Sequence, residues 1–450
     1  MAMKEKYTII DKLMIALIVL FSFYYLEPFF IWETFAGGVF RNLFGAIPFR
    51  TLFGFGIIVL WLAFYSKKGI KRSKIRLAGS IFFIAIFTVC LAGGSERTQI
   101  LSLAWLPYFV VASYILLPEK IQRKSYNVFV TIFAVTLILP ILWYILTHLG
   151  FRIPYSILES YEEIKVIRGK FYKLYPLATQ ITSRWDPLYQ ELHLCGIYDE
   201  AGRVGTLAGL VLVSEKYRLK GNWKNIIILI AGILSFSLAF YAIAVVYYLV
   251  SCFDKKKYKN IAIILGIIVV YFVFMSVDFD DPNIRIWQGR FQITSEGLSG
   301  NNRTNADFDA LMDDFYHSDT YSILFGKGDG AIGEIQTARN IDGSSYKCMI
   351  YNFGFVGYGL SILWLVLYAV HMCKIKGANK TQIIAVLSVY LANMYQRPSV
   401  FYMGYMLIFF GGIVIASQEK IGAKQVVVQR KRRRSIFRVR RSSAFGNIQR

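Results

Sequence analysis

Two acidic residues and an arginine stand together at the start of one apolar run of this chain. In the segment His193–Thr206 they are Asp199, Glu200 and Arg203. Charges at the edge of an apolar run are costly, so they indicate either a paired network or a functional site. Asp199 and Arg203 have the i,i+4 spacing of an ion pair on one helix face, and this structural alternative stays open. Glu200 points about 100° away on a 3.6-residue helix, which makes it the candidate for a base that accepts a hydroxyl proton.

Arginines form a second group of candidates. Arg285, Arg290 and Arg303 lie in the long polar stretch 278–346, and Arg397 lies at the end of a later apolar run. Guanidinium groups bind phosphate oxygens through paired hydrogen bonds and keep their charge. Several arginines that converge from separate elements would therefore suit a diphosphate. For Arg397 the alternative is an arginine that extends its head group to a membrane surface.

The chain as a whole has the composition of a membrane protein. Of its 450 residues, 56% are hydrophobic and 18% are charged, and the mean hydropathy is +0.46. Apolar runs recur at the length that crosses a bilayer core as a helix, roughly 20 residues. We predict an all-α polytopic membrane protein with about 11–12 transmembrane helices. The expected spans are about 8–24, 48–66, 77–93, 98–117, 127–149, 196–214, a pair within 225–253, 259–277, 347–373, 381–396 and 399–416.

The net charge of +23 indicates a topology rather than a nucleic-acid partner. Lysines and arginines cluster in short loops, which is the pattern of the cytoplasmic side of a membrane protein. The clusters are Lys67–Arg76, Lys120–Lys124, Lys216–Lys224, Lys255–Lys259, Lys374–Lys380 and Arg430–Arg441. The last belongs to a basic cytoplasmic tail, residues 417–450, which we interpret as an anchor on anionic lipids, with RNA binding as the alternative. No small-residue cleavage site follows the first apolar run, so we expect a retained first helix and two cytoplasmic termini.

Residues 225–253 lie between two basic loops and must leave the cytoplasmic side and return to it. At 1.5 Å per residue, legs of about 14 residues reach about 21 Å, which is short of a bilayer core. We therefore predict two short helices or a re-entrant pair that breaks near Leu234–Ser237. Such irregular backbone is tolerated at membrane depth where protein or a wet cavity surrounds it. The alternative is one long tilted helix, which would reverse every later loop.

With this hairpin, both long polar loops fall on the non-cytoplasmic side. They are residues 150–194 and 278–346, which are far longer than ordinary connections. The second loop is rich in aromatic side chains and contains the glycine-rich segment Leu324–Gly330. We therefore expect the two loops to form a folded cap over a membrane-embedded site. Residues 1–416 are assigned to a single transmembrane domain.

Motifs of soluble enzymes and metal sites are missing from the sequence. Gly326–Gly330 lacks the Lys-Ser/Thr ending of a phosphate-binding P-loop, and there is no His-Glu-x-x-His motif. The histidines and cysteines show no metal-ligand spacing, so we expect neither a metal nor a cofactor. Of the scattered cysteines, Cys195 and Cys348 are the pair that could meet on the outer face.

In these segments the chain resembles the O-antigen and polysaccharide repeat-unit polymerases, which are related to the O-antigen ligases. His193–Gly205 is similar to their Gly-x-Phe-Asp-Glu-Pro-Gly segment, with Tyr198 at the aromatic position and Ala201 at the proline. The resemblance covers roughly residues 130–416. The other motifs that look like this family are Arg290 with Arg303, Leu324–Gly328, the Gly354-x-x-Gly357 start of a span, and Tyr395–Pro398.

The resemblance implies a metal-independent glycosyl transfer on the outer face of the bacterial cytoplasmic membrane. Oligosaccharide repeat units linked to undecaprenyl diphosphate would be joined into O-antigen of lipopolysaccharide or into capsule-type polysaccharide. Fixed arginines would stabilise the charge on the leaving diphosphate, and a positioned acceptor hydroxyl would supply proximity. The implied partners are membrane lipids, a flippase and a chain-length regulator, with no nucleic acid. The implied catalytic residues are Glu200, Arg290 and Arg303, and the implied substrate or diphosphate ligands are Lys173, Arg184, His193, Arg203, Arg285, Tyr346 and Arg397.

Three alternative functions stay open. The related ligases carry a histidine in the outer loop before a glycine-containing span, and no histidine stands near Gly343 here, which favours a polymerase. Another type of lipid-linked-sugar transferase would show an acidic pair in its first outer loop, where this chain has only Glu27 and Glu33. A flippase or transporter would show internal repeats and charges in mid-span, and the sequence shows neither.

Overall fold

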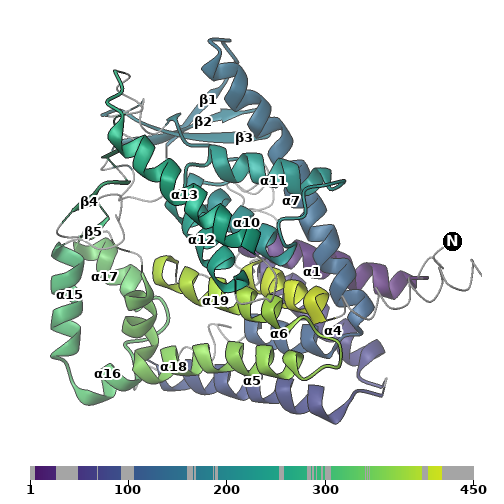
Figure 1. The fold of residues 1–450 in the computed structure, drawn as a ribbon. Coiled ribbons are helices and arrows are strands. Elements are labelled where there is room, and N and C mark those ends of the chain that lie inside the picture. Colours follow the sequence, from purple (N-terminus) through teal and green to yellow (C-terminus); the bar gives the residue numbers. More distant parts are fainter. Residues whose placement is uncertain are drawn as a thin grey trace, which may run out of the picture.

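The computed structural model describes a mostly helical protein (Figure 1). Arg290, Arg303, the first predicted outer loop and the basic tail beyond Ser417 lie outside the described residues. The described residues are 6–26, 49–67, 69–92, 106–159, 166, 169–185, 187, 191–252, 258–280, 285, 288–289, 291–294, 297–298, 306–339, 341, 343, 345–397 and 404–417.

The elements follow the chain in this order. The first part forms helices α1 (Ile9–Tyr25), α4 (Phe49–Leu60) with the π-helical turn η2 (Trp61–Tyr65), α5 (Arg72–Leu91), α6 (Leu106–Leu116) and α7 (Glu119–His148). The middle forms strands β1 (Ser156–Glu159), β2 (Lys170–Tyr175) and β3 (Ala178–Ser183), then helices α10 (Ala201–Ser214), α11 (Trp223–Leu234), α12 (Leu238–Ser251) and α13 (Tyr258–Ser276). The last part forms strands β4 (Ile293–Thr294) and β5 (Gly297–Leu298), helices α15 (Ala306–Tyr316), α16 (Thr320–Phe325), α17 (Ala331–Arg339), α18 (Tyr346–Cys373) and α19 (Lys380–Gln396), and a helix at Gly404–Ser417.

Two of the described helices, α7 and α18, are long and apolar enough to cross a membrane. Further apolar helices have 10–17 residues, among them α6, α10, α11, α12 and Gly404–Ser417. Helix length alone therefore does not establish the larger number of predicted spans, which stays a prediction. One boundary differs from expectation, because α7 begins at Glu119 and includes the basic cluster Lys120–Lys124, which we had placed in a loop.

The predicted break within 225–253 is confirmed. Helix α11 ends at Leu234, α12 begins at Leu238, and Phe236 between them has φ +51°. The Ser235 hydroxyl donates to the Gly232 carbonyl at 2.7 Å and accepts from the Ser237 N–H at 3.3 Å. Serine hydroxyls that bond to nearby backbone compete with helical hydrogen bonding, which is why the helix stops here. The alternative of one long helix is wrong.

The prediction of a purely helical protein is wrong for the loop 150–194, which contains a sheet. Strands β1, β2 and β3 pair antiparallel in that order, with Tyr175 opposite Ala178 at the turn. Pro176 and Leu177 form the two-residue connection, and Leu177 has the positive φ (+56°) that such tight hairpin turns need. The sheet packs its inner residues, Tyr172 and Ile181, on a small core that includes Cys195. Cys195 is a free thiol, as is Cys348, so the two do not form a disulfide.

The described part of the second polar loop is folded, as predicted. In α15, Phe308, Leu311, Met312 and Phe315 repeat at helical spacing and are buried together with Ile332 of α17. Burial of an apolar stripe of this kind is the main source of stability for a short surface helix. Helices α15, α16 and α17 therefore form a compact unit, which we call the cap.

Two glycines join the cap to α18. Gly326 has φ +85° and Gly354 has φ +67°, and a Cβ on either residue would lie within 2.2 Å of backbone atoms of the opposite segment. The close approach allows the N–H of Lys327 to donate to the Tyr351 carbonyl at 2.9 Å and the N–H of Gly328 to donate to the Asn352 carbonyl at 3.0 Å. These contacts give a structural reason for the glycines of both motifs, because Gly326 and Gly354 let the two backbones approach each other.

The sheet and the cap are separate parts of the fold, with the sheet at the top of the view and α15–α17 at its lower left (Figure 1). The Tyr144 hydroxyl, near the end of α7, donates to the Leu192 carbonyl at 2.8 Å, which fixes the sheet side. On the cap side, the Tyr346 ring at the start of α18 stacks on Tyr395 near the end of α19, with centroids 5.7 Å apart. The described parts of the two long polar loops are thus each held to the helical bundle by their own contacts, and the predicted placement of both on one side of a membrane stays a prediction.

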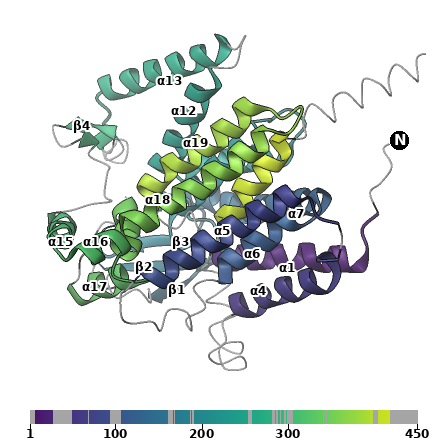
Figure 2. The same ribbon diagram turned by 90° about the horizontal axis from the view of Figure 1, so that it is seen from below.

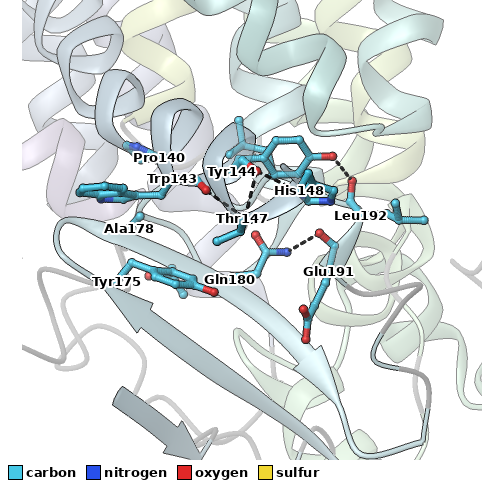
Figure 3. Close-up of a pocket in the computed structure, with 12 residues that line it drawn as sticks. Pro140, Trp143, Tyr144, Thr147, His148, Tyr175, Ala178, Gln180, Glu191 and Leu192 are labelled. Carbon is cyan, nitrogen blue, oxygen red and sulfur yellow. Dashed lines mark hydrogen bonds between the residues drawn. The ribbon is translucent and has the colours of Figure 1, made fainter. Parts of the chain in front are cut away.

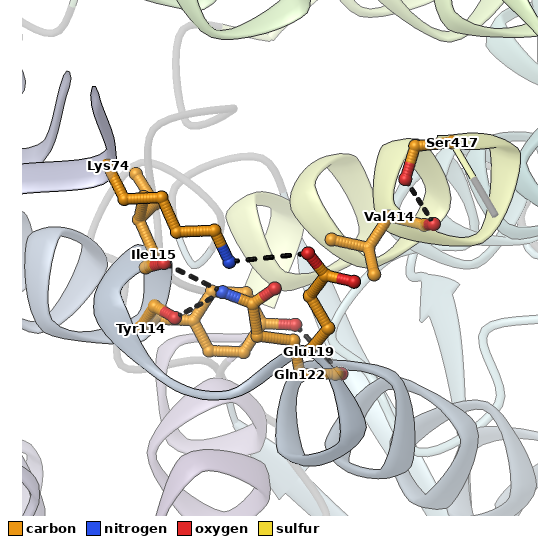
Figure 4. A network of polar contacts seen from close by, with 7 residues as sticks. All are labelled: Lys74, Tyr114, Ile115, Glu119, Gln122, Val414 and Ser417. Carbon is orange, nitrogen blue, oxygen red and sulfur yellow. Dashed lines mark hydrogen bonds and ion pairs between the residues drawn. The ribbon is translucent and has the colours of Figure 1, made fainter. Parts of the chain in front are cut away.

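The opposite end of α7 carries basic residues in a separate polar network (Figure 4). Lys74 of α5 pairs with Glu119 at 3.5 Å, and the Gln122 side-chain amide donates to the Tyr114 carbonyl at 2.7 Å. Nearby, Lys120 pairs with the buried Asp11 of α1 at 2.9 Å. These contacts tie α1, α5, α6 and α7 together at the end where the sequence places the cytoplasm.

Candidate functional site

A buried ion pair joins two of the predicted site residues across the fold. Arg397 Nη1 lies 2.6 Å from Glu200 Oε1, and the side chains are 7% and 35% exposed. Burial of the guanidinium acts to lower the pKa of Arg397, but its neighbours, the Glu200 carboxylate first among them, act the other way and together raise this pKa above its ordinary value. Arg397 therefore stays charged and buried, and the alternative of an arginine extended to the membrane surface is wrong. Glu200 is the accessible member of the pair.

A second ion pair lies beside the first. Arg203 Nε is 3.3 Å from Asp199 Oδ1, at the i,i+4 spacing, and Arg203 Nη1 donates to the Leu26 carbonyl at 2.8 Å. The structural alternative for Arg203, an ion pair with Asp199 on one helix face, is therefore confirmed. Two of the nitrogens of Arg203 contact other groups of the protein. Asp199 and Glu200 carry two negative charges, and Arg203 and Arg397 carry two positive ones. These four side chains are formally neutral, so a diphosphate would need further cations.

Four chain segments converge to position these side chains. Glu200 is the N-cap residue of α10 in an extended conformation (φ −151°), and Arg397 is the C-cap residue of α19. Leu26 is the C-cap residue of α1, and Gly404 packs so closely on it that a Cβ would lie 2.3 Å from the Leu26 side chain. The ends of α1, α10, α19 and the helix Gly404–Ser417 thus form one junction. We call Asp199, Glu200, Arg203 and Arg397 the charge cluster.

Arg397 also has hydrogen-bonding capacity that the described residues do not use. Its Nε and Nη2 are buried without a hydrogen-bond partner within the described part of the chain, as is the Tyr198 hydroxyl. Burying such a donor without a partner costs about 1–3 kcal/mol. A protein keeps this cost where a site uses the group, so the unpaired nitrogens add to the case that the charge cluster is functional.

The other predicted ligands are not part of the charge cluster, and each has partners of its own. Lys173 pairs with Glu191 at 2.6 Å, Arg184 pairs with Glu159 at 3.2 Å on the exposed edge of the sheet, and Arg285 lies 3.7 Å from Asp278. His193 is buried, and its carbonyl accepts from Gln180 at 2.9 Å. Tyr346 stacks on Tyr395, two residues before Arg397. Arg290 and Arg303 lie outside the described residues, so their predicted place in the site stays a prediction.

Sequence reasoning missed a pocket of about 220 Å³ between the end of α7 and the sheet (Figure 3). We call it the sheet pocket. Aromatic and uncharged polar side chains dominate its lining. Six of its lining residues are Trp143, Tyr144, Thr147, Tyr175, Thr179 and Gln180. Since β2 and β3 were not predicted, no signal in the sequence brought these residues together. Among the described residues, no three His, Cys, Asp or Glu side chains lie together as metal ligands would.

The coupling between Glu200 and Arg397 can be measured by a double-mutant cycle. With Glu200→Gln, Arg397→Gln and the double variant, we expect a coupling free energy of about 1–3 kcal/mol, because the arginine is buried. Denaturant unfolding of the full chain in detergent micelles measures it. The matched control is Lys347 with Asp309, which also lie 2.6 Å apart but are 24% and 51% exposed. There we expect less than about 1 kcal/mol. Equal coupling in both pairs would show that the Glu200–Arg397 pair is an ordinary surface contact.

Comparison with other proteins adds no assignment. The resemblance to repeat-unit polymerases therefore stays a resemblance of short motifs, without an overall match to support it. No family model, curated protein or solved structure matches this chain.

Proposed function

We propose first that the chain is a polytopic membrane protein of the bacterial cytoplasmic membrane. The support is an exposed apolar surface. On α7, Ile132, Val135, Ile138, Leu142 and Ile145 repeat every three or four residues and are 39–51% exposed, while the opposite face is buried. Water-soluble proteins rarely expose continuous apolar stripes of this kind, whereas a lipid-facing helix does.

Helix α13 gives the same support from the edge of the bundle (Figure 2). It is joined to the bundle through α12, and large apolar residues are exposed around much of its surface. Val269, Val270 and Phe272 are 59–67% exposed. A helix that is apolar on all sides must be surrounded by protein or lipid, so lipid is the natural environment of α13. The basic network at one end and the polar loops at the other then give the inner and outer sides.

We infer further that the chain polymerises oligosaccharide repeat units carried on undecaprenyl diphosphate, at the outer face of this membrane. The observation that carries the proposal is the buried Arg397–Glu200 pair at 2.6 Å, which joins the start of α10 to the end of α19. Ionisable groups in such a position are expensive and mark a functional site by default. The motifs shared with repeat-unit polymerases include both partners of the pair.

The proposed chemistry is a displacement at the anomeric carbon of the lipid-linked donor. The acceptor hydroxyl oxygen forms the new C–O bond while the bond to the diphosphate breaks, and the diphosphate leaves on its lipid. Glu200, the exposed member of the pair, accepts the hydroxyl proton. Arg397 holds that carboxylate in place and, with Arg203, supplies positive potential near the leaving group. Because the charge cluster is neutral, the proposal assigns the remaining neutralisation of the diphosphate to Arg290 and Arg303.

Reconstitution tests the proposal directly. The full chain, purified and placed in liposomes, is given undecaprenyl-diphosphate-linked repeat units, and the products are separated by size. The proposal expects a ladder of lipid-linked polymers without any other protein. Transfer to a lipid A core acceptor, with no ladder, would identify a ligase instead. Movement of the lipid-linked units across the bilayer, with no new glycosidic bond, would identify a transporter.

A further inference from the structure

An exposed apolar edge of the cap lies where the cap meets the ends of α5 and α18 (Figure 1 and Figure 2). Tyr316, Tyr321 and Leu324 of the cap are 37–42% exposed, and Phe355 of α18 is 48% exposed. The Tyr316 ring stacks on Phe355 with the centroids 6.1 Å apart. The Tyr321 hydroxyl donates to the carbonyl of Leu91, the last residue of α5, at 2.8 Å. We call Tyr316, Tyr321, Leu324 and Phe355 the cap rim.

Helix α18 measures the distance from the cap rim to the basic end of the molecule. Lys374 is the exposed C-cap residue of α18, and the kink at Gly354 lies 20 residues before it. At 1.5 Å per residue this distance is about 30 Å, which is the thickness of the hydrocarbon core of a bilayer. With Lys374 at the inner surface, where the proposed topology places it, the outer boundary of the hydrocarbon core crosses α18 near Gly354. Phe355 of the cap rim is the next residue.

The face of α18 between these two levels is apolar and exposed. Phe355, Leu363, Leu367 and Val370 are 38–48% exposed, and the exposed Gly359 lies between the first two. Their spacing of three or four residues places them on one side of the helix. An apolar stripe of this kind marks a contact with lipid in a membrane-spanning helix. Because Phe355 is the outer end of the stripe, the lipid that covers the stripe also reaches the cap rim.

Helix α5 gives the same level independently. Gly357 of α18 packs so closely on α5 that a Cβ there would lie 2.8 Å from the methyl group of Thr88. The two helices run in opposite directions, because α5 ends and α18 begins beside the cap. Leu91, three residues after Thr88, is therefore level with Gly354. Tyr321, which bonds to Leu91, lies at the same boundary.

The side chains around the rim suit the layer of lipid head groups better than the hydrocarbon core. A tyrosine has an apolar ring and a hydroxyl that forms hydrogen bonds, and tyrosines are enriched at membrane–water interfaces for this reason. Asp309 lies on the same face of α15 as Tyr316 and pairs with Lys347 at 2.6 Å, which a polar layer tolerates. Asp314 points about 160° away from Tyr316; its side chain is 74% exposed and lies 3.8 Å from Arg339. The cap thus has an aromatic side and a charged side, which is the arrangement of a surface that lies in a membrane interface.

We propose that the cap rim lies in the head-group layer of the outer leaflet, so that phospholipid holds the cap as well as its contacts with α18. Lipid is the occupant because the rim continues the exposed stripe of α18 and stands one hydrocarbon thickness from the basic end. The proposal rests on the membrane location given under the proposed function, and it does not depend on the polymerase activity.

Photocrosslinking to lipid tests the proposal on the full chain with its native cysteines. Benzoylphenylalanine, which inserts into nearby C–H bonds when irradiated, replaces one residue at a time. Tyr316 and Leu324 report on the cap rim. Asp314, two residues from Tyr316 on the same helix, is the matched control that faces water, and Leu363 is the control within the hydrocarbon core. Each variant that is monodisperse on size exclusion is placed in nanodiscs of phosphatidylethanolamine and phosphatidylglycerol, irradiated and weighed intact by mass spectrometry.

We expect the mass of one phospholipid to be added at Tyr316, Leu324 and Leu363, and no such addition at Asp314. Addition at Leu363 alone would show that the cap stands clear of the membrane and would overturn the proposal. Equal addition at Asp314 and Tyr316 would overturn it too, since the contact would not be confined to the rim. A crosslink between two copies of the chain at Tyr316 or Leu324 would assign the rim to a protein interface and reject lipid as its occupant.

This experiment fails separately from the proposed function. Lipid addition at the rim, in a protein that makes no polymer from lipid-linked repeats, would keep the rim and reject the polymerase. A polymer ladder from a protein whose rim takes up no lipid would keep the polymerase and reject the rim. Absence of lipid addition at Leu363 would reject the membrane location itself, and the rim with it.

Discussion

Arg397→Gln is expected to stop polymer formation while leaving the protein in the membrane. The change removes a buried charge that holds Glu200 at 2.6 Å and supplies positive potential where the diphosphate leaves. Loss of one preorganised group that stabilises developing charge lowers rates by about a hundredfold or more. The rate at which purified protein extends undecaprenyl-diphosphate-linked repeats measures the effect, and the length of the surface glycan in cells provides a second reading.

Two further variants separate a role in the reaction from a role in folding. Arg397→Lys keeps the positive charge and a partner for Glu200 but loses the planar fork of the guanidinium. We expect its melting temperature to stay close to that of the parent while the rate falls by more than about tenfold, roughly the weight of one charge-assisted hydrogen bond. Arg339→Gln removes an arginine of the cap that is 54% exposed and pairs with Asp314 at 3.8 Å, and it should leave the rate unchanged. Full activity in Arg397→Gln would remove the charge cluster from the mechanism.

The parts of this fold that followed from the sequence are those fixed by local chemistry. The two short legs of residues 225–253 and the serines Ser235 and Ser237 between them predicted the break between α11 and α12. The aromatic residues of the loop 278–346 predicted that this loop folds, although not that α15 is a helix. Glu200 and Arg397 were recognised because charges at the ends of apolar runs are rare. In each case the signal lies within a few neighbouring residues, so no knowledge of tertiary contacts was needed.

The remaining features depend on contacts between distant segments. Strands β2 and β3 bury polar residues such as Thr179 and Thr182, so the alternation of apolar and polar residues that would predict a half-buried strand is missing. The sheet pocket lies between these strands and α7, so it could not be predicted without them. The pairing of Glu200 with Arg397 depends on the junction of α10 and α19, which the sequence does not reveal. The sequence also does not reveal which carboxylate each arginine pairs with, and Arg203 pairs with Asp199.

The glycine pair that joins the cap to α18 gives the second large effect, this time on stability. Gly354→Ala should destabilise the protein severely. The residue has φ +67° and ψ −179°, a backbone conformation open to glycine almost alone, and the added Cβ would lie 2.1 Å from the Leu324 carbonyl oxygen. Relief of that clash requires α16 and α18 to separate, which would break the Lys327–Tyr351 and Gly328–Asn352 hydrogen bonds. The combined cost is about 3–5 kcal/mol, in the range reserved for backbone strain and buried clashes.

A second glycine of the same helix is the matched control for this prediction. Gly359 is exposed, and a Cβ there would meet nothing within 4 Å, so Gly359→Ala should be neutral or stabilising by about 0.5–1 kcal/mol, the usual gain for alanine over glycine in a helix. Thermal unfolding in detergent, followed by the loss of monodisperse protein on size exclusion, compares the two variants under one condition. Because α18 begins beside Tyr395 and Arg397 directly follows α19, release of the cap should also disturb the charge cluster. We therefore expect Gly354→Ala protein that survives at low temperature to form polymer more slowly than Gly359→Ala. Equal melting temperatures in the two variants would show that the cap does not depend on this close approach of two backbones.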